Sequence, residues 1–183
     1  MSGFRNCMAQ SARELKKTRS LTTLALLIAL TVIVDFFTFQ PFQYLHLSFE
    51  FVPKAAIGML FGPVPGMLAG AASDLISFAL NPKGAYFPGY TLTAVVSGLI
   101  YGLILYRRRI TWPRAAVAVA TVTLVCNVGL NNLWTFLLMG PGFWGLLPAR
   151  LIKSAVALPC EVVILTVALK LIQTIRVRPR AHA

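Results

Sequence analysis

The chain has 183 residues, of which 57% are hydrophobic and only 12% are charged. A soluble domain of this length needs a polar shell, which 22 charged side chains (17 basic and 5 acidic) can hardly supply. Long apolar runs are instead typical of a protein that crosses a membrane several times. Composition therefore excludes most soluble classes and predicts an all-α, polytopic membrane protein in which the helices form one bundle in the lipid bilayer.

The net charge of +12 would suit a nucleic-acid-binding protein, but its distribution does not. Of the 17 basic residues, 13 form three clusters that flank apolar runs, as the positive-inside rule describes for cytoplasmic segments. We therefore expect a membrane protein with both termini in the cytoplasm and no nucleic-acid partner. The clusters are Arg5, Arg13, Lys16, Lys17 and Arg19; Arg107, Arg108, Arg109 and Arg114; and Lys170, Arg176, Arg178 and Arg180.

The same clusters divide the chain into three parts. Residues 1–18 form a basic cytoplasmic arm, which is either frayed or lies against anionic lipid headgroups. Residues 19–175 form the membrane domain, and residues 176–183 form a basic cytoplasmic tail. The scattered Cys7, Cys126 and Cys160 match no zinc or disulfide spacing, and His46 has no second histidine near it. We predict no metal site and no cofactor.

Six apolar segments separated by proline- and glycine-containing turns predict six transmembrane helices. We place them at about residues 20–39, 49–61, 64–80, 91–106, 115–138 and 147–175. Thr91 is the expected cap of the fourth helix. Small residues recur four apart, a spacing that lets membrane helices pack closely; the pairs are Ala25 and Ala29, Gly58 and Gly62, and Gly66 and Gly70.

Several ionisable residues lie in segments that lipid should keep apolar, where each is costly unless it has a partner or a ligand or is neutral. Glu50 and Lys54 are four apart on the second helix, so they form either an internal ion pair or part of a ligand site. Asp74 lies in the outer third of the third helix, where it binds a ligand or bridges helices. Glu161 lies near mid-membrane and must be neutral or paired.

Amides and rings gather toward the predicted outer side. Asn127, Asn131 and Trp134 share one face of the fifth helix, which favours a binding wall over helix packing alone. Aromatic residues in the first two outer loops suit stacking on a flat ligand; they are Tyr44, Tyr86, Phe87 and Tyr90.

Two cations open the sixth helix. Arg150 and Lys153 are three apart and share a face about one turn inside the membrane, with no acid nearby in the sequence. Either side chain could snorkel to the interface, but together they predict a site for an anion, held by charge-assisted hydrogen bonds.

Three segments give the chain a family resemblance: SFEFVPKAAIGMLFGPVPGMLAGAASDLISF, NPKGAYFPGYTLTAVVSGLIYGLILYRR and LLPARLIKSAVALPCEVVI. With Ala25 and Ala29 they span most of residues 25–165. The chain resembles the substrate-binding S component of an energy-coupling factor (ECF) vitamin importer, most closely the folate-specific type. Phe51, Lys54 and the Ala72–Ser73 pair before Asp74 depart from that pattern.

The resemblance implies a six-helix protein that captures folate at the outer face and docks on a membrane coupling subunit and two ATPase subunits. It also implies that Ala25 and Ala29 face the coupling subunit. The chain has no phosphate-binding loop motif, so ATP would be used by the partner subunits only.

Other interpretations remain open at this stage. The same scaffold could bind a hydroxymethylpyrimidine, pyridoxine-like or pantothenate ligand, although two cations favour a dianion. An autonomous transporter would be expected to show internal repeats, and none is evident. The five acids are too dispersed for a metal-dependent membrane enzyme, so we do not predict an enzyme.

Overall fold

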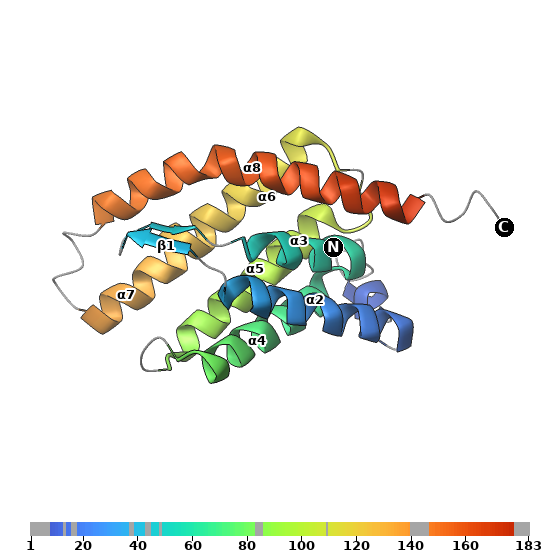
Figure 1. Ribbon diagram of the computed structural model, residues 1–183, viewed down its shortest axis with the longest axis horizontal. Helices are drawn as coiled ribbons and strands as arrows, with labels where there is room; N and C mark the ends of the chain where they lie inside the picture. The colour runs from blue at the N-terminus through green and yellow to red at the C-terminus, as the bar shows by residue number, and fades with distance from the viewer. Residues whose placement is uncertain are drawn as a thin grey trace.

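The computed structural model describes residues 8–12, 14–15, 18–36, 39–42, 45–47, 49–82, 86–108, 110–139 and 147–177. Helices dominate, and Figure 1 shows them as a bundle of elongated elements lying roughly alongside one another. The helices are α2 (Thr18–Phe36), α3 (Phe51–Phe61), α4 (Pro63–Leu80), α5 (Pro88–Leu105), α6 (Trp112–Val122), the π-helical segment η1 (Thr123–Leu130), α7 (Asn131–Met139) and α8 (Leu147–Val177).

The helices are apolar enough to make this a multi-pass membrane protein. Within the described residues, four helical segments have the length and hydropathy to cross a bilayer: Pro63–Leu80, Pro88–Leu105, Trp112–Leu138 and Ala157–Thr174. Two shorter apolar helices, Ser20–Phe36 and Phe51–Phe61, accompany them. Large apolar side chains such as Leu26, Leu124 and Val167 are more than half exposed, as lipid-facing residues are.

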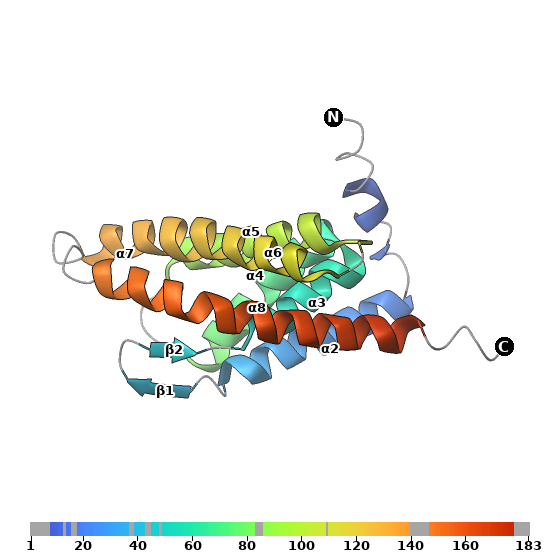
Figure 2. The same ribbon diagram turned by 90° about the horizontal axis from the view of Figure 1, so that it is seen from above.

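The elements run back and forth so that their ends collect at two ends of the bundle. Figure 2 shows α6, η1 and α7 as one continuous row beside α8, with the end of α7 and the start of α8 toward the same end as the hairpin of β1 and β2. The start of α2 and the end of α8 lie toward the opposite end. The helical residues 8–12 also lie toward that opposite end.

The expected first loop contains a short hairpin, so the fold is helical but not entirely so. Strand β1 (Phe39–Phe42) pairs antiparallel with β2 (Leu45–Leu47), with an irregular register between them. The helix predicted to reach residue 39 ends at Phe36 instead. Pro41 cannot continue a helix but can lie in an edge strand, which accounts for the change.

The fourth predicted helix begins earlier than expected. Helix α5 starts at Pro88, with Phe87 as its extended N-cap residue, so Thr91 does not cap it. Proline is well suited to the first helical position, because its fixed φ is helical and its missing N–H would be unpaired there anyway. The prediction that Thr91 is the cap is wrong, and its hydroxyl bonds elsewhere.

The fifth predicted helix contains a wider turn that the sequence did not indicate. The chain is helical from Trp112 to Met139, but residues 123–130 form a π-helix. Such segments are frequent at functional sites because they redirect side chains. Here the segment carries Cys126 and Asn127.

Glycines bring α4 and α5 into backbone contact, which confirms the close packing expected from Gly66 and Gly70. A Cβ at Gly66 would lie 2.6 Å from the carbonyl oxygen of Gly98, and one at Gly70 would overlap the carbonyl of Ala94. Any larger side chain would force the helices apart. These contacts hold the backbone of α5 directly against that of α4.

The N-terminal arm makes a contact that the sequence did not predict. Ser11 is fully buried; its Oγ donates to the carbonyl of Phe61 at 2.9 Å and accepts from the Val64 N–H at 3.1 Å. These bonds bracket Gly62, whose φ of +94° makes the α3–α4 turn. Part of the arm therefore packs on the bundle.

Candidate functional site

A cavity of about 220 Å³ lies between α3, α4, α5, η1, α7 and α8. Most of its lining side chains have hydrogen-bonding groups, which is unusual for the interior of a membrane bundle. The lining residues are Glu50, Phe51, Lys54, Asp74, Tyr90, Thr93, Ala94, Ser97, Tyr101, Val122, Thr123, Cys126, Asn127, Asn131 and Glu161.

The cavity brings together half of the twelve residues singled out as ligand contacts. These six come from five helical segments and the turn before α3: Glu50, Lys54, Asp74, Tyr90, Asn127 and Asn131. The amides of Asn127 and Asn131 reach one wall because they are four residues apart across the end of η1. The remaining candidates lie beside the cavity or outside the described residues.

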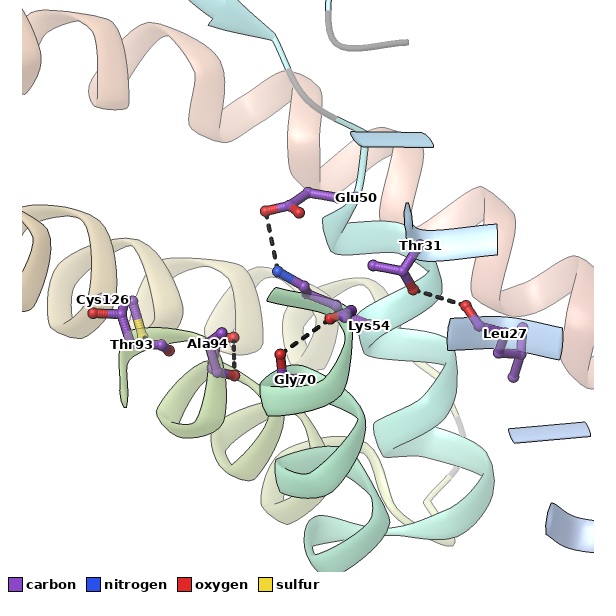
Figure 3. A network of polar contacts seen from close by, with 10 residues as sticks. Leu27, Thr31, Glu50, Lys54, Gly70, Thr93, Ala94 and Cys126 are labelled. Atoms are coloured by element: carbon purple, nitrogen blue, oxygen red, sulfur yellow. Dashed lines mark hydrogen bonds and ion pairs between the residues drawn. The ribbon is translucent and has the colours of Figure 1, made fainter. Parts of the chain in front are cut away.

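Glu50 and Lys54 form an ion pair on the cavity wall. Lys54 Nζ lies 3.1 Å from Glu50 Oε1, and the two side chains are 13% and 33% exposed respectively. Figure 3 shows the pair at the start of α3, with Lys54 directed into the bundle. The internal ion pair is thus present, and its residues still face the space that a ligand would occupy.

Asp74 enters the cavity from α4 and is held from α5. Thr91 Oγ1 donates to Asp74 Oδ2 at 2.7 Å, and Tyr86 Oη lies 2.9 Å from Thr91 Oγ1. Tyr86 itself packs on Phe78, with ring centroids 5.1 Å apart. Tyr86 therefore contacts the site through Thr91 and does not line the cavity.

Trp134 and Phe87 form a support behind the cavity wall. Trp134 Nε1 donates to Thr93 Oγ1 at 3.0 Å, and its ring centroid lies 5.6 Å from that of Phe87. Phe87 also meets Tyr90 edge-on at 6.0 Å. Of these rings only Tyr90 lines the cavity, and the predicted ligand contacts of Phe87 and Trp134 stay predictions.

Sequence reasoning missed a stripe of polar residues on α5. Thr93, Ser97 and Tyr101 recur every four residues on the face that lines the cavity. That spacing in an otherwise apolar helix was a usable signal. Glu161 on α8 also lines the cavity; the sequence marked it as costly to bury but assigned it to no site.

The charge of the cavity lining is unbalanced. It contains the carboxyl groups of Glu50, Asp74 and Glu161 but, among the lining residues, the single amine of Lys54. Such a lining accepts more hydrogen bonds than it donates. It suits a ligand group that is rich in N–H donors.

Three predicted contacts lie beyond what the structure describes. Tyr44 is outside the described residues. Arg150 and Lys153 lie in the first two turns of α8, but their side chains are outside the described part. Their role stays a prediction.

The fold and the cavity define a class: a membrane-embedded helical bundle that encloses a polar site for a small solute. The family model for the substrate-specific component of ECF transporters matches residues 19–175. The chain belongs to this family of ECF transporter substrate-specific components.

Individual relatives agree with the family model. The folate transporter FolT of Clostridium novyi is 32% identical over 163 residues, which cover 89% of this chain and 95% of that protein. FolT of Leuconostoc mesenteroides is 35% identical over 151 residues, covering 79% and 81%. A crystal structure of FolT bound with folic acid matches with a TM-score of 0.72 and 37% identity, covering 80% of this chain and 89% of that one.

Proposed function

We propose that this chain is the folate-binding S component of an ECF importer. It captures folate at the outer face of the membrane and delivers it inward after docking on the coupling subunit and two ATPases. The proposal rests chiefly on the acceptor-rich cavity, which lies in a fold shared with a FolT that was crystallised with folic acid.

The chemistry of the cavity suggests which end of folate enters it. At about 220 Å³ the cavity is smaller than the roughly 300–1,000 Å³ of pockets that enclose a whole drug-sized ligand. The pterin ring carries an amino group and a ring N–H side by side, and a carboxylate such as Asp74 can accept both. We therefore place the pterin in the cavity and the glutamate tail toward the start of α8.

The tail of folate carries two carboxylates, and Arg150 and Lys153 lie in the first two turns of α8. Charge-assisted hydrogen bonds to these carboxylates would supply both affinity and orientation. Tyr44, in the predicted first outer loop, is a candidate to cover the ligand. This arrangement separates the acceptor-rich cavity from the cationic entrance.

We propose that six spans cross the membrane, with residues 1–18 and 176–183 in the cytoplasm. Two observations support this orientation. The exposed Arg107 and Arg108 follow the C-terminal end of α5, whereas the cavity residue Tyr90 lies at its start. Helix α2 begins, and α8 ends, toward that same end of the bundle. Positive charge at cytoplasmic ends is the usual arrangement.

The proposed docking surface for the coupling subunit lies on α2. Ala25 and Ala29 are both exposed there, beside the exposed Leu26, Leu30 and Ile33. Small residues in such a setting allow another membrane helix to approach closely. The chain has no phosphate-binding loop motif, which supports ATP hydrolysis by the partner subunits.

Ligand binding tests the proposal directly. Purified protein in detergent should bind folic acid in isothermal titration calorimetry, and a hydroxymethylpyrimidine, pyridoxine or pantothenate should not compete. Asp74→Asn should weaken binding by about 10-fold or more, because an amide replaces one acceptor with a donor. Asp35→Asn, a matched change outside the cavity lining, should leave binding unchanged.

Transport is tested in proteoliposomes. The chain alone should bind folate without accumulating it, and accumulation should require the coupling subunit, both ATPases and ATP. Accumulation by the chain alone would contradict the assignment to an S component.

A further inference from the structure

We infer that Thr91 is a positioning residue that orients the Asp74 carboxylate for its ligand, and that Tyr86 in turn orients the Thr91 hydroxyl. This inference rests on the proposed function and deepens it, because it assigns two residues that set specificity without touching the ligand. The chain of contacts runs from an exposed ring, Tyr86, through Thr91 to a cavity carboxyl group.

Counting donors decides the direction of the chain of hydrogen bonds. A threonine hydroxyl has one proton and two acceptor lone pairs. Thr91 Oγ1 gives its proton to Asp74 Oδ2 at 2.7 Å, so it has none left for Tyr86. The 2.9 Å contact with Tyr86 must then be donated by the phenol. The order is Tyr86 to Thr91 to Asp74, and each bond polarises the next.

Thr91 forms a different hydrogen bond from most other threonines in the described helices. A threonine within a helix commonly donates to the carbonyl four residues earlier. Seven threonines in the described helices do so, whereas Thr91 donates across to another helix; the seven are Thr22, Thr31, Thr93, Thr121, Thr135, Thr166 and Thr174. Its neighbour Thr93, two residues away, shows that the local backbone permits the usual bond.

The backbones on either side of this bond are held rigidly. Asp74 lies one turn beyond Gly70, which contacts Ala94, and Ala94 lies three residues beyond Thr91. A hydrogen bond from α5 to one carboxylate oxygen therefore restrains rotation of the whole group. Two N–H donors on one edge of a ligand need both oxygens in their plane, so this restraint favours such a ligand over one with a single donor.

The experiment compares two ligands on a set of conservative variants. The ligands are folic acid and an analogue in which the 2-amino group is replaced by methyl. Thr91→Val keeps the shape of the side chain but removes the hydroxyl. It should raise the Kd for folic acid by about 10-fold and the Kd for the analogue by less than about 3-fold. Thr91→Ser, which keeps the hydroxyl, should restore binding of folic acid.

Tyr86→Phe tests the outer link. Because Tyr86 acts through Thr91, loss of the Tyr86 hydroxyl alone should raise the Kd for folic acid by about 3-fold. In the double variant with Thr91→Val it should cause no further increase in that Kd. Thr121→Val is the control: it removes a hydroxyl whose exposed hydrogen bond to the Val117 carbonyl stays within one helix, and should change neither Kd.

The outcomes separate this inference from the proposed function. If wild-type protein binds folic acid and Thr91→Val binds it equally well, the positioning role is wrong and the proposed function stands. If Thr91→Val weakens the binding of both ligands by the same factor, Thr91 has only a structural role and the inference is also wrong. If wild-type protein does not bind folic acid, the proposed function fails and the inference fails with it.

Discussion

Lys54 Nζ lies 3.1 Å from Glu50 Oε1 on the wall of a cavity that also contains Asp74 and Glu161. The cation of Lys54 is thus the one amine among three lining carboxyl groups. In a setting away from bulk water, an ion pair is costly to break because the remaining charge loses its partner. The pair therefore contributes to the stability of the empty site as well as to its charge.

Glu50→Gln should lower the stability of the protein without bound ligand. Both side chains are partly exposed, so we expect a loss of about 1–2 kcal/mol, well below the cost of a fully buried pair. The midpoint of thermal unfolding in detergent should fall by about 2–8 °C. The double variant Glu50→Gln, Lys54→Met should recover part of this loss, and an additive loss would show that the pair does not act as a unit.

Gly98→Ala should separate α4 from α5. The added Cβ would overlap the carbonyl of Gly66, and relieving such overpacking costs about 1–3 kcal/mol. We expect a lower unfolding midpoint and weaker folate binding, because Asp74 and Thr91 lie on the two helices. The matched control is Gly129→Ala, where the nearest atom would be 3.4 Å away. Equal effects of the two changes would refute the packing argument.

Ser11→Ala should destabilise the end of the bundle away from the cavity. It removes both hydrogen bonds that the Ser11 hydroxyl makes around Gly62, which leaves the Val64 N–H without that partner. A lost hydrogen bond of this kind costs about 1–2 kcal/mol. Calorimetry should show lower stability but an unchanged Kd for folate. Thr22→Ala, on an exposed face of α2, should show neither effect.

Ala25→Leu with Ala29→Leu should block docking while leaving folate binding intact. Both positions are exposed on α2, and larger side chains would hold a partner helix away. Co-purification with the coupling subunit and ATP-driven uptake should be lost. Val117→Phe adds bulk to the exposed face of α6 and should not affect assembly. Assembly that survives the alanine changes would move the docking surface elsewhere.

Arg150→Ala and Lys153→Ala should weaken binding of the glutamate tail. One charge-assisted hydrogen bond contributes about 1.5–3 kcal/mol, which corresponds to roughly 10- to 150-fold in Kd. The loss should be larger for folic acid than for pteroic acid, which has one carboxylate in place of two. Lys170→Ala, at an exposed position near the other end of α8, is the control. An equal loss for both ligands would argue against contact with the tail.

Much of the site could be predicted because lipid makes polar residues conspicuous. A charged or amide group in an apolar helix is costly unless it has a partner or a ligand. This rule identifies Glu50, Lys54, Asp74 and the two asparagines, one helix at a time. All of them line one cavity. The sequence also predicts Trp134 and Phe87 as ligand contacts, but in the structure both rings lie behind the cavity wall. A pattern on one helix does not show which side chains of the neighbouring helices it packs against.

The amino-acid sequence by itself determined the helical membrane class, the clusters of positive charge and the small residues that allow close packing. These follow from composition and local spacing, since each helix must satisfy its backbone within itself in lipid. Only the tertiary structure decided that Thr91 bonds Asp74 instead of capping α5, that a π-helical turn carries Asn127, and that Ser11 reaches Phe61 fifty residues away. Those contacts join segments remote in sequence, and their geometry depends on how the helices pack.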